Sequence, residues 1–198
     1  MKRGFSFIEV LIVITIATFL VLIVINVNSN ISLLNNLVTQ ELQSKSDIDQ
    51  TLQIVTVNIR SAEASASGAY PVDSASTSTF AFYSDIDGDG ANEHVRYFLA
   101  SSSIYRGVIQ PTGTPPTYPT SSEIVTDIID NVIIPSSTSL FSYYDASYTG
   151  TQPALASTAD VSPIRLVQMS FYVDTKPRQA PGPQYFSALV DIRNLRSN

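Results

Sequence analysis

The sequence predicts an α+β fold in which a long N-terminal α-helix, membrane-spanning in its first half, packs by its second half on an antiparallel β-sheet head. Three observations support this prediction. An unbroken apolar run covers Phe5–Val27, and an amphipathic pattern extends it to about Ala62 without glycine or proline. Beyond the helix, short β-favouring segments alternate with turns rich in glycine, proline and aspartate.

The composition restricts the classes of function. The chain has 198 residues, a formal net charge of -6 and no cysteine. Without cysteine, neither a disulfide framework nor a thiolate metal site can form. The acidic balance argues against a nucleic-acid-binding surface, which requires a basic patch. We therefore expect no direct contact with nucleic acid.

The first element is the apolar run Phe5–Val27. At about 1.5 Å per residue it is roughly 35 Å long as a helix, against ~30 Å for the hydrocarbon core of a bilayer. Lys2 and Arg3 precede it, and the next cation is Lys45. By the positive-inside rule we expect a single pass in the cytoplasmic membrane, with a cytoplasmic N-terminus and an extracytoplasmic head.

Glu9 is the only ionisable side chain in this run. An acidic residue at the centre of a spanning helix costs ~2.5–3.5 kcal/mol, and less near its end. A secretory signal peptide would have a shorter apolar core and a small-residue cleavage site, which the segment "FLVLIVINVNSN" lacks. An ordinary signal anchor explains the length and the cations but not the glutamate. A partner for Glu9 is therefore expected.

The segment "RGFSFIEVLIVITIATFLV" resembles the N-termini of type IV pilins and of type II secretion pseudopilins. The resemblance implies that a prepilin peptidase cleaves between Gly4 and Phe5 and that the new amino group of Phe5 is methylated. It also implies that Glu9, the fifth residue of the mature chain, pairs with that amine on a neighbouring subunit. Many major pilins have proline where this chain has Asn26, which favours a minor pilin or a pseudopilin.

Three later segments are similar to W-type minor pilins and J-type minor pseudopilins. They are "VNIRSAEA", "FAFYSDIDGDGANEHVRYFL" and "FSALVDIRNLRSN". The resemblance implies a non-enzymatic subunit that builds or primes a type IV pilus-like or type II secretion filament at the cell surface or in the periplasm. Its partners would be other pilins, prepilin peptidase and the inner membrane. The implied organisation is a leader at 1–4, a helix at 5–62 with its membrane segment at 5–27, and the head at 63–198.

The outer half of the helix and the head follow from hydrophobic periodicity. Apolar residues recur at steps of three and four between Ile48 and Ala62, which indicates a helix face packed on the head. The segment Glu123–Ile134 fits either a short helix or a strand. Six further segments are expected to be strands: Thr79–Tyr83, Val95–Leu99, Ile104–Gln110, Leu140–Tyr144, Ile164–Val173 and Tyr185–Ile192.

The segment "SDIDGDGANEH" is a candidate calcium site. Asp85, Asp87 and Asp89 have the spacing of a D-x-D-x-D-G calcium loop, and Glu93 stands at its ninth position. The twelfth position, glutamate in an EF-hand, is Arg96 here. The alternative is a hairpin with an Asp-Gly turn whose carboxylates are solvated, with Arg96 and His94 as local counterions.

A rival function is a calcium-binding or enzymatic β-domain held outside the cell by an ordinary signal anchor. His94 is the only histidine, and the chain has no cysteine. A zinc site or a Cys-His nucleophile is therefore disfavoured. No G-x-S-x-G motif occurs, and "GDG" is too acidic for a phosphate loop. We therefore expect no enzymatic activity and no cofactor other than calcium.

Overall fold

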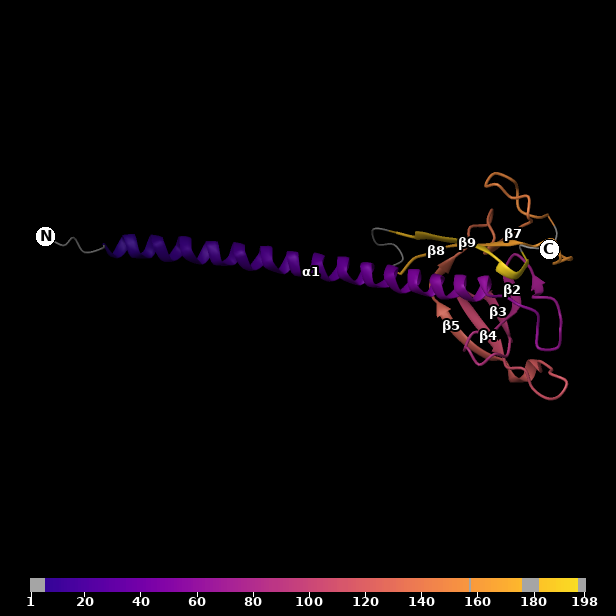
Figure 1. Cartoon of the computed structure of the whole chain (residues 1–198). Helices are drawn as coiled ribbons and strands as arrows, with labels where there is room; N and C mark the ends of the chain where they lie inside the picture. Colours follow the sequence, from indigo (N-terminus) through magenta and orange to yellow (C-terminus); the bar gives the residue numbers. More distant parts are fainter. Residues whose placement is uncertain (1–5, 157, 176–181, 196–198) are drawn as a thin grey trace. The chain divides into compact units, whose positions relative to one another are not determined.

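The structure is a computed structural model of the chain, which describes residues 6–156, 158–175 and 182–195. Within its first helix the side chains of residues 24, 26–38 and 40 are not described. The chain divides into two compact units, residues 1–46 and 47–198, which are described separately. The division falls inside helix α1, Phe7–Arg60 (Figure 1).

The first unit contains the N-terminal part of α1. Ser6 precedes the helix, and its carbonyl accepts hydrogen bonds from the backbone N–H groups of Glu9, at 3.0 Å, and Val10, at 3.2 Å. The hydroxyls of Thr15 and Thr18 each donate to the carbonyl four residues earlier, both at 2.8 Å. The two threonine hydroxyls therefore have hydrogen-bond partners within the helix itself.

The prediction of a membrane-spanning first half is corrected. Among the described residues, no helix is both long enough and apolar enough to cross a membrane. A crossing helix needs about 20 consecutive apolar residues to span the hydrocarbon core.

The second unit is sheet-rich, and its expected single sheet is in fact two. The first is an antiparallel five-stranded sheet in the order β1-β2-β3-β4-β5. In the second, β9 pairs along the whole of β8, while β6 and β7 pair with its two ends. The strands of the first sheet are β1 Val72–Ala75, β2 Thr79–Ser84, β3 Glu93–Ala100, β4 Ser103–Ile109 and β5 Ile124–Ile129. Those of the second are β6 Val132–Ile133, β7 Phe141–Tyr144, β8 Leu166–Val173 and β9 Gln184–Asp191.

The segment Glu123–Ile134 explains why two sheets form. It is extended, but its first part, β5, pairs with β4, and its second part, β6, pairs with β8. Between them Asn131 has a φ of 58°, in the left-handed region that asparagine tolerates better than most residues. This turn directs the chain from one sheet into the other.

One hydrophobic core joins the last turns of α1 to both sheets. Leu52, Val55 and Ile59 are buried on one helix face, as their spacing of three and four predicts. They share a cluster with aromatic side chains of both sheets, including Phe80, Phe82, Tyr97, Phe141 and Phe171. Two 3₁₀ turns, η1 Thr120–Ser122 and η2 Arg193–Leu195, complete the described elements of the fold.

The C-terminal segment closes the end of α1. The helix ends at Arg60, and the carbonyl of Ala62 beyond it accepts a hydrogen bond from the side-chain amide of Asn194 at 2.9 Å. The same amide donates to Glu63 Oε1 at 3.1 Å. Asn194 therefore supplies a partner for the backbone that leaves the helix.

Candidate functional site

Two regions carry the predicted site residues. Of the N-terminal set, Gly4 and Phe5 lie outside the described residues. Glu9 lies in the first turn of α1 and is exposed. A carboxylate there is favoured by the partial positive charge of the unpaired N–H groups at a helix N-terminus.

The surface around Glu9 is apolar on every side of the helix. All described side chains of Phe7–Ile23 are exposed, including Phe7 at 83% and Phe19 at 68%. Exposed apolar area costs about 25 cal/mol per Å² relative to burial. This segment is therefore suited to burial against other apolar surfaces, with Glu9 as its single charge.

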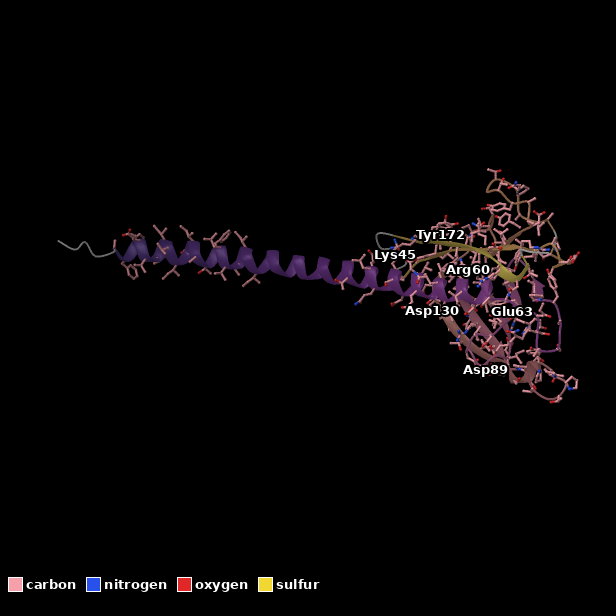
Figure 2. All side chains as sticks on the ribbon, viewed as in Figure 1. Lys45, Arg60, Glu63, Asp89, Asp130 and Tyr172 are labelled. Carbon is pink, nitrogen blue, oxygen red and sulfur yellow. The ribbon has the colours of Figure 1, made fainter. Side chains whose placement is uncertain are left out.

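The second region is the turn between β2 and β3, where Asp89 is labelled in Figure 2. The structure brings Asp85, Asp87 and Asp89 together, with one carboxylate oxygen of each within 4.8 Å of the others. Asp85 accepts hydrogen bonds from Gly88 N at 2.6 Å and Gly90 N at 3.0 Å. Both glycines have positive φ, 80° and 87°, which favours glycine at these positions. The turn thereby directs three carboxylates toward one point.

Glu93 is the first residue of β3, and it is more deeply buried than the three aspartates. Its exposed fraction is 0%. Oε2 accepts a hydrogen bond from Ile86 N at 2.9 Å, so the carboxylate reaches the backbone of the turn between Asp85 and Asp87. The other oxygen, Oε1, is buried and has no hydrogen-bond partner. Burial, and to a lesser extent the charges of Asp87 and Asp89, raise the pKa of Glu93.

The hairpin of the alternative is present, since β2 and β3 pair across the turn and Asp87 and Asp89 are exposed, but its two suggested counterions are paired elsewhere. Arg96 donates from Nε and Nη2 to the two carboxylate oxygens of Glu123, at 3.0 and 2.9 Å. His94 Nε2 pairs with Asp73 Oδ2 at 3.1 Å. Within the described part of the chain, no ion pair involves the three aspartates. Gln110, which follows the end of β4, is an uncharged partner of the turn. Its Nε2 donates a hydrogen bond to Asp87 Oδ2 at 3.2 Å.

Sequence reasoning missed two residues that hold the turn in place. The Asn92 side chain donates to Ala64 O at 2.7 Å, next to the end of α1. The Tyr118 hydroxyl donates to Asn92 O at 2.7 Å and accepts from Ala66 N at 2.9 Å. Tyr118 belongs to the proline-rich loop after β4, and no signal in the sequence connects it to the turn. The acidic turn is thus attached to two other segments.

A pocket of about 270 Å³ is a further cavity that sequence reasoning did not find. Arg106 Nε is buried there without a hydrogen-bond partner, and the exposed carboxylate of Asp127 lies at the same pocket. Opposite charges and apolar walls suit a small polar guest, but its volume is below that of most ligand sites, which begin near ~300 Å³. The lining residues are Thr51, Ile54, Val55, Tyr97, Arg106, Asp127 and Ile128.

In comparisons with known proteins, no family model and no curated protein sequence matches the chain. The functional argument therefore depends on the residues and the geometry described above.

Proposed function

We propose that the protein is a minor pilin or pseudopilin, a structural and assembly-priming subunit of a type IV pilus-like or type II secretion filament. The observation that carries this proposal is the helix segment Phe7–Ile23, whose described side chains are exposed and apolar around one carboxylate, Glu9. A filament core formed by copies of such helices would remove this apolar surface from water. The leader motif at Gly4 and Phe5 supports the same assignment.

Glu9 would specify how the helices assemble. Cleavage after Gly4 creates a positively charged amine on Phe5, four residues before the carboxylate in sequence. Within a filament core of low dielectric constant, that amine and the Glu9 of a neighbouring copy attract strongly, and each offsets the other's desolvation. Only one axial offset between two helices brings the two groups together. The pair would therefore set the register of the filament.

The remaining features follow from this role. The protein would act as a substrate of prepilin peptidase and as a partner of other pilins, without catalysing a reaction itself. Its sheet-rich unit would lie outside the cytoplasm, on a cell-surface or periplasmic filament. The similarity of "FSALVDIRNLRSN" to W- and J-type subunits supports a low-copy, assembly-priming position over that of a major subunit.

The intact mass of the mature protein tests the proposal. The chain is produced in a host that contains a prepilin peptidase, and the purified protein is weighed by mass spectrometry. We expect the loss of Met1–Gly4 and the gain of one methyl group on Phe5. A Gly4→Val variant, altered only in the leader, should keep its full length. Recovery of an uncleaved wild-type chain, or of one cut elsewhere, would exclude the pilin route.

A further inference from the structure

We propose that the pocket between α1 and the first sheet binds a small organic monocarboxylate, whose charged group is held by Arg106 and Tyr97. The proposal goes beyond the filament role and does not depend on it. The pocket has a volume of about 270 Å³, roughly that of nine water molecules at about 30 Å³ each. Thr51, Ile54 and Val55 line it from α1, and residues of β3, β4 and β5 line it from the sheet.

Arg106 places a cation on the face of the sheet that contributes to the core. In the register of β3 and β4, Arg106 is paired with Tyr97, so the two side chains lie on the same face. Tyr97 is buried and shares the hydrophobic cluster with Val55 of α1. Burial raises the pKa of Tyr97, whereas the hydrogen bond from Asn58 and the charge of Arg106 lower it. The guanidinium therefore lies close to a buried phenol.

The guanidinium of Arg106 lacks a counterion. Its Nε is buried and has no hydrogen-bond partner. In the part of the chain that the structure describes, the ion pairs are Arg96–Glu123 and His94–Asp73, and neither involves Arg106. Buried polar atoms in folded proteins are almost always satisfied, so an orphan N–H indicates a missing acceptor. Because arginine keeps its charge at all ordinary pH values, the strongest acceptor for it is an anion.

The Tyr97 hydroxyl is a second donor without an acceptor. It accepts a hydrogen bond from Asn58 Nδ2 at 2.9 Å, and the neighbouring guanidinium of Arg106 can also only donate. Among the described residues no group accepts the proton of this phenol. A carboxylate has two oxygens, so one could accept from Arg106 Nε and the other from the Tyr97 hydroxyl. The two unmet donors thus match one carboxylate group.

The remaining lining residues restrict the class of anion. Ile54, Val55 and Ile128 are apolar, and they would remove a short aliphatic chain from water. Of the lining residues, Arg106 and Asp127 are charged. Asp127 repels an anion in proportion to its charge, so a single carboxylate is favoured over a multiply charged ion such as phosphate. A short-chain acid of the size of butyrate fits these conditions.

The binding test follows the Nε–H resonance of Arg106 by ¹H–¹⁵N NMR while the purified full chain is titrated with sodium butyrate. We expect this resonance to shift, with a dissociation constant of about 1 mM for so small a ligand. Butyramide has the same size without the charge, and sodium phosphate has charge without the aliphatic chain. Each should bind at least tenfold more weakly. Sodium chloride at equal ionic strength controls for screening.

Arg106→Gln and Arg60→Gln are matched variants, because each removes one positive charge. Arg60, labelled in Figure 2, is exposed at the end of α1 and does not line the pocket. In calorimetry, Arg106→Gln should weaken butyrate binding at least tenfold, whereas Arg60→Gln should bind like the wild type. Tyr97→Phe removes only the hydroxyl and should weaken binding about threefold or more.

Arg106→Met tests whether the guanidinium serves the ligand or the fold. It replaces a cation that has no counterion by an apolar side chain, so Tm without butyrate should equal or exceed that of the wild type. A lower Tm would show that the fold itself uses the charge, and would overturn the proposal. An Arg106 resonance that butyrate does not shift, equal binding of butyramide or phosphate, or undiminished binding by Arg106→Gln or Tyr97→Phe would do the same. The wild-type titrations decide the matter even if a variant does not fold.

Discussion

Arg96 on β3 forms a bidentate ion pair with Glu123, which precedes β5, and Gly107 on the intervening strand β4 makes room for it. Arg96 and Gly107 are paired in the β3–β4 register. The Glu123 side chain lies over Gly107, in the space that a β-carbon would occupy, and reaches the guanidinium at 2.9 and 3.0 Å. The guanidinium also lies 4.0 Å from the centre of the Phe98 ring. The pair thus joins three strand segments on one face of the sheet.

Gly107→Ala is therefore expected to displace Glu123 and to weaken its pair with Arg96. Both side chains are partly exposed, so the free energy of unfolding should fall by about 1 kcal/mol, as for partly solvated ion pairs. Urea unfolding measures the change. The matched control repeats the substitution in a Glu123→Ala background, where no side chain collides and the added methyl should cost little. An equal loss in both backgrounds would show that the close contact is not the cause.

Ile59 and Val57 provide a second comparison on the same turn of α1. Ile59 has an exposed fraction of 0% and belongs to the core, whereas Val57 is 60% exposed. Ile59→Ala should lower the free energy of unfolding by about 2–5 kcal/mol, through lost burial and a cavity. Val57→Ala should change it by less than about 0.5 kcal/mol. Similar losses for the two variants in urea unfolding would contradict the packing of this helix face.

Tyr83 predicts a loss of stability at alkaline pH. Burial, then the charge of Asp73 and its hydrogen bond with the phenol, raise the pKa of Tyr83 from 10.0 to about 12. Because the folded pKa is above the unfolded one, stability from this group is complete below about pH 10 and is lost as the pH rises through about 12. The other groups that face the phenol are His94 and Tyr118, with ring centres at 5.2 and 5.1 Å.

Tyrosinate absorbance during a pH titration, together with Tm at each pH, checks this prediction. Asp73→Asn removes the charge and should bring the late-titrating tyrosine closer to pH 10, while Tyr83→Phe should remove it. Other buried tyrosines with raised pKa, such as Tyr143, remain in both variants and provide an internal reference. A titration that Asp73→Asn leaves unchanged would show that Asp73 does not act on Tyr83.

The strands of the head could be predicted where alternation was clear. In β8 buried and half-buried residues alternate along its whole length, and the predicted strand there is confirmed. Strand β1 was missed because "VDSA" is short and mostly polar, and it is held by pairing with β2 rather than by its own pattern. The division into two sheets depends on the left-handed turn at Asn131, which local propensity does not specify.

For the acidic turn, the sequence predicted which carboxylates cluster but not which residues the nearby cationic side chains pair with. Its spacing identified three aspartates that the structure does bring together. The partners of Arg96 and His94 were not predictable, because Glu123 and Asp73 are 27 and 21 residues away in sequence and meet them only through strand pairing. The burial of Glu93 likewise follows from packing of the β3 end and not from a motif. Local spacing thus indicated which carboxylates lie close together, whereas the tertiary structure determined the partners of Arg96 and His94.

The last prediction concerns Glu9 and the filament. Glu9→Gln keeps the size of the side chain in the first turn of α1 but removes its charge. In the proposed filament, the amine of a neighbouring Phe5 would then lose its partner. Removing one member of a buried ion pair costs about 3–5 kcal/mol, because the other charge stays buried alone. We expect at least a tenfold fall in the fraction of subunit recovered in sheared filaments. Thr15→Val is the control, since its hydroxyl only bonds Leu11 O at 2.8 Å, and it should assemble normally. Intact mass must show cleavage after Gly4 in both variants, so that a processing defect is distinguished from an assembly defect. Normal incorporation of a cleaved Glu9→Gln chain would reject the pairing role.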